Sequence, residues 1–410
     1  MVPLPGYAGE GDRTNAKRDR TADADVVVGF LKCTGTTMLN DDQLMIQEAA
    51  QRFAYDKLRP FAGDWDARKH FPVDVMREAA GLGFAAIYTQ EEHGGSGMSR
   101  LDAVLIFEQL SRGCIATAAF LSIHNMCTWM IDSFGSTDLR ARFVPRLTGM
   151  ELIASYCLTE PGSGSDAAAM KTRAEREGET YVLNGSKAFI SGAGVSDIHV
   201  VMAKTGESIS AFVVPKETPG LGFGANEKKM GWNAQPTRQV MFDNVRIPAQ
   251  NRIGAEGEGF KFAMKGLDGG RLNIAACSLG GAQDALDRAR QYAAERNQFG
   301  KPLNAFQVTQ FKLADMETEL QAARAMLYEA AARLDAGTPD ATKWCAMAKR
   351  FVTDAGSKVA NEALQIHGGY GYLHDYGVER IVRDLRVHQI LEGANEIMRI
   401  IIARDMLKDQ

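Results

Sequence analysis

The sequence predicts an α+β protein with a helical N-terminal domain, a middle antiparallel β-barrel-like domain and a C-terminal four-helix bundle. Apolar residues recur at helical spacing from Asn40 to about Ser155. Short β-prone runs separated by turn residues follow, from about Tyr156 to Pro248. Long helical stripes return after about Gly257. The strands are not interleaved with helices, so a doubly wound parallel sheet is not expected.

Composition limits the class of protein. The chain has 410 residues, of which 45% are hydrophobic and 24% charged, so it can bury a large core. Its net charge of -4 gives no sign of a nucleic-acid-binding surface. The six cysteines form no C-x-x-C pair, so we expect no metal site, no disulfide framework and no secretion. The longest apolar stretch, near 116–123, is shorter than the roughly 18 residues of a membrane-spanning helix.

Residues 1–37 differ from the rest because they lack helical or strand periodicity. Arg13 and Lys17 would suit an organelle presequence, but the acidic Asp12 and Asp19 argue against one. We therefore expect a flexible tail, with a presequence or a tag as alternatives. The predicted domains are 1–37 for the tail, 38–155 for the N-terminal helices, 156–256 for the β domain and 257–410 for the bundle.

The N-terminal helices have recognisable ends. Asn40 and Asp41 can cap a helix that Pro60 stops. A second helix is expected within 71–84, a loop at 91–100 and a further helix from Leu101.

In the middle domain, the pair Asn184-Gly185 lies between β-prone residues in 181–191 and predicts a hairpin turn. Further strands are expected within 198–205, 210–217 and 238–248. These short strands favour a small antiparallel barrel or sandwich.

Two apolar stripes mark the long C-terminal helices. One covers 313–334 and ends before Gly337, and the other covers 344–359 and ends at His367-Gly368-Gly369. With helical segments at 272–294 and 397–406, they predict a four-helix bundle.

The stretch LTEPGSGSDAAAM (158–170) contains a G-x-G-x-x-A pattern at Gly162, Gly164 and Ala167. A Rossmann loop requires a helix directly after this pattern. Residues 171–177 instead indicate a strand and a turn. We therefore interpret the stretch as a loop whose backbone N–H groups could face an anionic or heterocyclic ligand.

Four other clusters each allow two interpretations. Arg271 in LDGGRLNIA could bind a phosphate at a helix start or lie on the surface. Arg296 could bind a charged group or belong to a tight inter-helix turn, and QIHGGYGY (365–372) could be more than a helix cap. Glu392 follows Ile390-Leu391, and an apolar setting would raise its pKa into the range of a general base. Alternatively, Glu392 caps the helix that follows it.

Together, these clusters resemble the acyl-CoA dehydrogenase family over residues 39–408. The motifs are YCLTEPGSGSD, GSKAFISGAG, RNQFGKPL, QIHGGYGY and LEGANE. The resemblance implies FAD between the β domain and the bundle, a homotetramer built from two dimers, and an electron-transfer flavoprotein as acceptor. It implies no membrane span, and a mitochondrial matrix location in a eukaryote or a cytoplasmic one in a bacterium.

The resemblance also assigns site residues by position. The FAD contacts it implies are Tyr156, Cys157, Leu158, Thr159, Gly164, Ser165, Phe189, Ile190, Ser191, Arg296, Phe306, Gln307, Gln365, Ile366, His367, Gly368, Gly369, Ala394, Asn395 and Glu396, some of them from a neighbouring subunit. The acyl-CoA contacts it implies are Ser165, Asp268, Gly269, Gly270, Arg271 and Arg404. Many family members carry Trp where this chain has Phe189.

The resemblance makes Glu392 the catalytic base, which takes the α-proton of the thioester. Some relatives carry the base just before the arginine of the LDGGR segment, where this chain has Gly270, so Glu392 is the only candidate. The expected substrate is a short branched acyl-CoA. Isobutyryl-CoA, oxidised to methacrylyl-CoA in valine breakdown, is favoured over 2-methylbutyryl-CoA and butyryl-CoA. A remoter alternative is a flavin oxidase of the same fold, although the base of the nitroalkane oxidases is Asp.

Overall fold

The computed structural model describes residues 39–408, and the chain divides into two units, Met1–Leu44 and Met45–Gln410. The tail predicted at 1–37 lies outside the described residues. At the start of helix α2 (Asp41–Phe53), the N–H of Gln43 donates to Asn40 Oδ1 at 2.9 Å, and Gln43 Oε1 accepts from the N–H of Asn40. This reciprocal pair is a capping box, so the helix begins where the sequence predicts.

Five further helices follow before the sheet: α3 (Ala62–Arg68), α4 (Val73–Ala80), α5 (Arg100–Gly113), α6 (Ile115–Phe134) and α7 (Thr137–Thr148). A single π-helical turn, Ala54–Leu58, continues α2 up to Arg59 and Pro60. Asn125 of α6 organises the loop after α4, because its side chain accepts from the N–H of Ile87 and donates to the carbonyl of Phe84.

The middle of the chain forms one mainly antiparallel sheet. Its strands are β1 (Ala154–Cys157), β2 (Arg173–Glu177), β3 (Thr180–Ser191), β4 (Ile198–Thr205), β5 (Ser208–Pro215), β6 (Leu221–Phe223), β7 (Thr237–Pro248) and β8 (Arg252–Ile253). The order is β6-β7-β3-β2-β4-β5-β8, with β1 paired to β4. The β4 pairings with β1 and β2 are parallel, which the sequence did not predict.

Both faces of strand β4 are buried. Along β4, Val200 and Met202 pack with residues of α6, α7 and α8, whereas Val201 and Ala203 pack with residues of β3 and β7 on the other face. Successive side chains of a strand point to opposite faces, so one strand supplies two apolar clusters.

The hairpin predicted at Asn184-Gly185 is wrong, because both residues lie inside the 12-residue strand β3. Pairing with β7 shifts register between Leu183 and Gly185. Gly185 has φ +144, and a Cβ there would lie 2.7 Å from the Cα of Thr172. The glycine therefore serves a strand irregularity and a close backbone approach. The actual hairpin turn joins β2 to β3 around Gly178.

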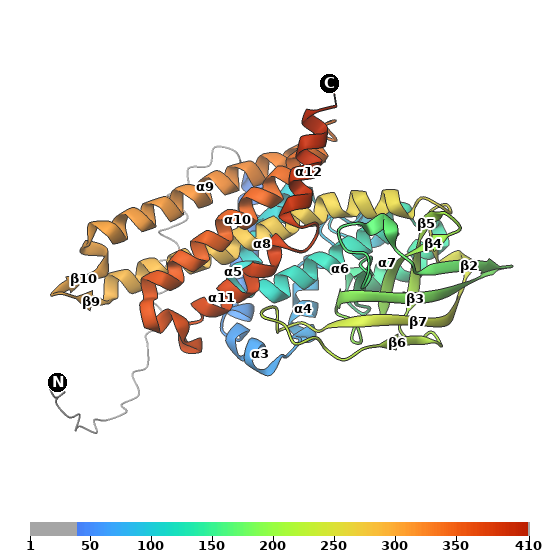
Figure 1. The fold of residues 1–410 in the computed structure, drawn as a ribbon, viewed down its shortest axis with the longest axis horizontal. Helices are drawn as coiled ribbons and strands as arrows, with labels where there is room; N and C mark the ends of the chain where they lie inside the picture. Colours follow the sequence, from blue (N-terminus) through green and yellow to red (C-terminus); the bar gives the residue numbers. More distant parts are fainter. Residues whose placement is uncertain (1–38, 409–410) are drawn as a thin grey trace. The chain divides into compact units, whose positions relative to one another are not determined.

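Long helices form the C-terminal part: α8 (Gly259–Glu295), α9 (Gln307–Asp335), α10 (Ala341–His367), α11 (Val378–Arg386) and α12 (Asn395–Met406). A small hairpin, β9 (Asn297–Gln298) and β10 (Lys301–Pro302), links α8 to α9. Helices α8, α9 and α10 pack side by side, and α12 packs on α10 (Figure 1). The predicted order of helices, sheet and helical bundle is confirmed.

Close packing joins the bundle to α5. A Cβ on Gly280 of α8 would lie 1.8 Å from the carbonyl oxygen of Glu108, so only glycine fits there. The buried Glu108 carboxylate accepts from the guanidinium of Arg324 and, at 2.8 Å, from the hydroxyl of Tyr328, both on α9. A buried carboxylate satisfied in this way holds α5, α8 and α9 in register.

Within residues 39–408, no helix is long and apolar enough to cross a bilayer. The same residues contain no group of three or more His, Cys, Asp or Glu side chains placed to hold a metal ion.

Candidate active site

Glu392 lies on a sharp turn between α11 and α12. Its φ is +53, and the next residue, Gly393, has φ +93. Left-handed backbone is unfavourable for a residue with a Cβ, so the surroundings must hold Glu392 in this conformation. The turn directs the Glu392 side chain onto Gly270 of α8.

The carboxyl group of Glu392 packs directly on Gly270. A Cβ at Gly270 would lie 2.1 Å from Glu392 Oε2 and 2.9 Å from its carboxyl carbon. Any side chain at position 270 would therefore clash with the Glu392 carboxyl group in its observed conformation. The two positions at which the family resemblance locates a base thus meet in space, and only one of them carries a carboxylate.

Gly270 and Arg271 do not lie at a helix start, so that prediction is wrong. Helix α8 begins at Gly259, and the glycine pair lies inside its 37 residues. No helix N-terminus is available there for a phosphate. Arg271 is 5% exposed, and its Nη1 atom donates to Asp268 Oδ1 at 2.7 Å. The second oxygen of Asp268 accepts from the hydroxyl of Thr342.

The electrostatic setting of Glu392 suits a base. Burial raises the pKa of its carboxyl group to about 7, while the nearby Lys349 and Arg271 oppose the rise. The Oε2 atom is buried, and no hydrogen bond to it is found among residues 39–408. An unsatisfied buried carboxylate oxygen is costly unless a ligand or a proton engages it. Near neutral pH this group can therefore both accept and release a proton.

Three further side chains close to Glu392 are neutral at physiological pH. Burial raises the pKa of the Tyr88 and Tyr156 hydroxyls and of the Cys277 thiol, and each of these groups interacts with the charge of Glu392. The hydroxyl of Tyr156 is also buried and has no hydrogen-bond partner within the described part of the chain. The sequence assigned Tyr156 to the cofactor, but it gave no signal for Tyr88 or Cys277.

The loop after β1 contains the G-x-G-x-x-A pattern and is anchored by a buried ion pair. Lys187 of β3 is fully buried, and its Nζ atom donates to Glu160 Oε1 at 2.8 Å and to the carbonyl of Leu158 at 3.0 Å. Glu160 also accepts from the N–H groups of Lys171 and Thr172. Only one 3-10 turn follows the glycines before β2, so the rejection of a Rossmann loop is confirmed.

This anchoring brings two predicted cofactor segments together. The carbonyl of Thr159 accepts from the N–H of Ala188 at 2.8 Å, which places the loop beside Phe189–Ser191. Phe189 has φ +58 and a side chain that is 69% exposed, whereas Ile190 is buried. Gly164 and Ser165 are also exposed. An exposed aromatic ring and open backbone groups fit a flat heterocycle such as isoalloxazine.

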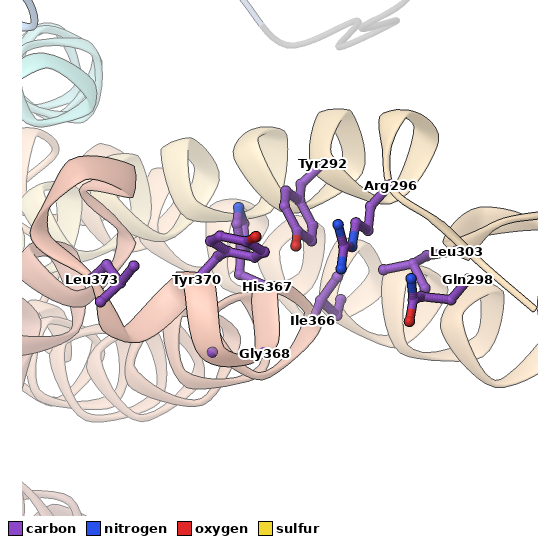
Figure 2. Close-up of a pocket in the computed structure, with 10 residues that line it drawn as sticks. Tyr292, Arg296, Gln298, Leu303, Ile366, His367, Gly368, Tyr370 and Leu373 are labelled. Atoms are coloured by element: carbon purple, nitrogen blue, oxygen red, sulfur yellow. The ribbon is translucent and has the colours of Figure 1, made fainter. Parts of the chain in front are cut away.

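A second predicted group lines a pocket of about 360 Å³ at the far end of α8 and α10 (Figure 2). Arg296 points into this pocket, which His367, Gly368 and Gly369 line from the end of α10. Five lining residues were not assigned to the cofactor from the sequence, namely Tyr292, Gln298, Leu303, Tyr370 and Leu373. Tyr292 stacks on His367 with ring centroids 4.5 Å apart, and the guanidinium of Arg296 lies 5.4 Å from the ring centre of Tyr370. Tyr292 precedes Arg296 by one helical turn, and this spacing could have revealed it.

The pocket and Glu392 lie far apart in one chain. Figure 1 shows α8 as one continuous helix, and the 25 residues from Gly270 to Glu295 extend about 37 Å at 1.5 Å per residue. That distance exceeds the span of a single dinucleotide. The structure therefore brings Glu392, Gly270 and Arg271 together, and separately Arg296 with 366–369, but it does not unite the two groups within one chain.

The other predicted residues divide between surface and interior. Phe306 is half-buried and packs edge-on against Phe299, which is 95% exposed, and Gln307 and Gln365 are exposed. Arg404 is exposed on α12. The side chain of Asn395 is buried and bonded within the chain to Lys349, Thr353 and Asp354.

Comparison with known proteins agrees with this geometry. Models of the acyl-CoA dehydrogenase N-terminal, middle and C-terminal domains match residues 40–151, 155–245 and 257–407. The mitochondrial isobutyryl-CoA dehydrogenase of Dictyostelium discoideum is 54% identical over 90% of both chains. The Bos taurus protein of that name is 53% identical over 93% of both.

Two solved structures extend the comparison. The butyryl-CoA dehydrogenase of Megasphaera elsdenii is 38% identical, with a TM-score of 0.87 over 90% of this chain and 99% of its own. The FAD complex of PigA is 32% identical, with a TM-score of 0.87 over 90% and 98%. Family models that cover all three parts, and relatives above half identity, leave one conclusion: the chain belongs to the acyl-CoA dehydrogenase family.

Proposed function

We propose that this enzyme removes two hydrogens from isobutyryl-CoA to give methacrylyl-CoA, a step of valine breakdown, with Glu392 as the catalytic base. The observation that carries the proposal is the carboxyl group of Glu392, buried on Gly270 with one oxygen unsatisfied. The identity of 54% to an isobutyryl-CoA dehydrogenase supports the choice of substrate. In a eukaryote the enzyme would act in the mitochondrial matrix, and in a bacterium in the cytoplasm.

Glu392 takes the α-proton of the thioester through its free carboxylate oxygen. An acyl chain that lies beside Gly270 would bring its α C–H bond next to Oε2, the carboxylate oxygen that has no hydrogen-bond partner among the described residues. The raised pKa makes the carboxylate a stronger base than a solvated glutamate, and Lys349 and Arg271 keep a useful fraction ionised. The N–H of Glu392 is the group of this chain assigned to polarise the thioester oxygen.

A bound FAD would supply the acceptor for the β-hydride and the route for electrons to an electron-transfer flavoprotein. The 156–165 loop and Phe189–Ser191 would hold its ring system, and Thr159 would hydrogen-bond to it. Arg296 and the end of α10 would hold the remainder, with Phe306 and Gln307 nearby. The separation of about 37 Å along α8 implies that these two groups serve different FAD molecules. Each site would then be completed by a second copy of the chain.

A homotetramer built from two dimers accounts for exposed apolar groups on the same part of the molecule. Phe299, Val308 and Phe311 are 95%, 64% and 58% exposed on the β9–β10 hairpin and the start of α9. Exposed large hydrophobic residues that cluster in this way mark an interface.

The CoA contacts follow from exposure. Ser165 and Arg404 are exposed and available to the polar chain of CoA. Arg271 is buried and already paired with Asp268, so it contributes mainly through its charge near Glu392. Gly269 and Gly270 have no side chains, so Arg100 packs directly on the first and Glu392 directly on the second.

The substrate is tested by kcat/KM for isobutyryl-, 2-methylbutyryl-, isovaleryl- and butyryl-CoA with a dye acceptor. One methylene in an apolar pocket is worth about 1–3 kcal/mol, so we expect isobutyryl-CoA to lead by roughly 10-fold or more. A different best substrate would overturn the substrate assignment. Fast reoxidation of the reduced enzyme by O₂ would instead favour an oxidase.

Glu392→Gln should lower kcat by about 10²–10⁴-fold, because the amide cannot take the α-proton. Flavin content should match that of the wild type, which shows that the loss is chemical. In the wild type, kcat/KM should rise with pH up to about 7, as the base becomes ionised. Substantial turnover by the variant would remove Glu392 from the role of base.

The same variant should show the stability cost of burying the carboxyl group. Because the pKa is raised from 4.5 to about 7 on folding, the folded protein binds more protons than the unfolded chain between these pH values. Wild-type stability therefore falls as pH rises through that range. The Tm of Glu392→Gln minus that of the wild type should increase from pH 4.5 to 7.

Arg296→Ala should lower flavin retention, because it removes the only cation that lines the 360 Å³ pocket among the described residues. The flavin-to-protein absorbance ratio after gel filtration is the measurement. Arg290→Ala, which alters an arginine elsewhere on α8, is the matched control and should retain its flavin. Equal flavin content in the two variants would refute the role of Arg296.

A further inference from the structure

Lys349 is a buried cation directly beneath the Glu392 turn. It lies on α10 and has no exposed surface. Its Nζ atom donates to the carbonyl of Gly393 at 2.7 Å and to Asn395 Oδ1 at 2.9 Å. Within residues 39–408, no salt bridge to Lys349 is found. An ammonium group buried without a carboxylate partner is expensive, and burial lowers its pKa to about 8.

The first hydrogen bond of Lys349 fixes the backbone of the turn. Glu392 and Gly393 are two successive left-handed residues, so small rotations there would swing the carboxyl group away from Gly270. The carbonyl of Gly393 is the acceptor that ties this turn to α10. The hydrogen bond from Lys349 to Gly393 thus keeps the Glu392 carboxyl group against Gly270.

The second hydrogen bond fixes the start of α12. Asn395 is its first residue, and its side chain also donates to Thr353 Oγ1 at 3.0 Å and to Asp354 Oδ1 at 2.7 Å. Lys349, Thr353 and Asp354 all lie on α10. The turn that carries Glu392 therefore has one end clamped to α10 through Lys349 and its neighbours.

Charge gives Lys349 a second role. The cations that act on Glu392 are Lys349 from α10 and Arg271 from α8, while Tyr88, Tyr156 and Cys277 are neutral. Arg271 is paired with Asp268, whereas Lys349 has only neutral acceptors. The charges that act on Lys349 are Glu392, Arg271, Asp354 and Glu396, and His388 also interacts with it. Among residues 39–408, Arg271 therefore has a carboxylate bonded to it, whereas the carboxylates that act on Lys349 form no salt bridge with it.

We propose that Lys349 is a positioning residue that holds the Glu392–Gly393 turn through the Gly393 carbonyl and supplies the charge that keeps the buried Glu392 carboxylate ionised near neutral pH. This inference rests on the proposed role of Glu392 as the base. Lys349 touches neither substrate nor cofactor in this account and acts through Glu392.

The test is the pH dependence of kcat/KM for the flavin-loaded Lys349→Met enzyme. Methionine keeps the length and loses the charge and both hydrogen bonds. Removing a nearby cation raises the pKa of a carboxyl, so the acid limb should move up by about one pH unit or more. At a fixed pH below the limb, that shift equals a loss of about 10-fold in kcat/KM. kcat should fall more than KM changes.

Lys349→Gln separates charge from hydrogen bonding and guards against a misfolded methionine variant. The amide can still donate to the Gly393 carbonyl, so kcat at high pH should partly recover while the acid limb stays displaced. Thr353→Val is the matched control. Thr353 lies on α10, as Lys349 does, and accepts a hydrogen bond from Asn395. The substitution removes this bond without changing the charge, so the acid limb of the variant should coincide with that of the wild type.

Failure of the inference about Lys349 can be distinguished from failure of the proposed dehydrogenase function. If the wild type is inactive on every acyl-CoA, or Glu392→Gln remains active, the function itself fails. If the wild type is active, Glu392→Gln is inactive and both Lys349 variants keep the wild-type acid limb with native flavin content and Tm, the inference about Lys349 is refuted.

Discussion

The contact between the Glu392 carboxyl group and Gly270 is the constraint on which the candidate site depends. A Cβ at position 270 would lie 2.1 Å from Oε2, so the base and the α8 surface are fitted to each other at a single residue. Packing of this kind removes water from the carboxyl and raises its pKa. It also requires a left-handed backbone at Glu392, which the bundle must stabilise. The long helices α8 and α10 therefore act as the two rigid surfaces between which the reactive group is held.

The sheet carries the loop and the exposed Phe189 ring that the proposed function assigns to the flavin. The buried Lys187–Glu160 pair orders the loop after β1, and the loop in turn adjoins Phe189. Burying an ion pair is rarely a net gain in stability. Here it satisfies two backbone N–H groups as well, so it fixes the shape of a glycine-rich loop that has little preference of its own.

Much of the fold could be predicted because it follows from local periodicity. The helix starting after Asn40 and the stripes at 313–334 and 344–359 all lie within observed helices. Two wrong predictions concerned glycines. Gly269-Gly270 and Asn184-Gly185 suggested ends of elements, whereas both lie inside elements where tertiary packing requires a residue without a side chain. No single-sequence pattern distinguishes a glycine that breaks a helix from one that admits a neighbour. Lys349 was missed for a similar reason, since a lysine within a helical stripe normally lies on the surface.

The protonation state of Glu392 is the most direct test of this account. The C=O stretch of its carboxylic acid can be followed by infrared difference spectroscopy between the wild type and Glu392→Gln across pH 4 to 9. A protonated-carboxyl band that is lost with a midpoint near 7, and that the variant lacks, is the predicted result. A midpoint near 4.5, the value of a solvated glutamate, would contradict the claim that a buried carboxyl on Gly270 organises the site.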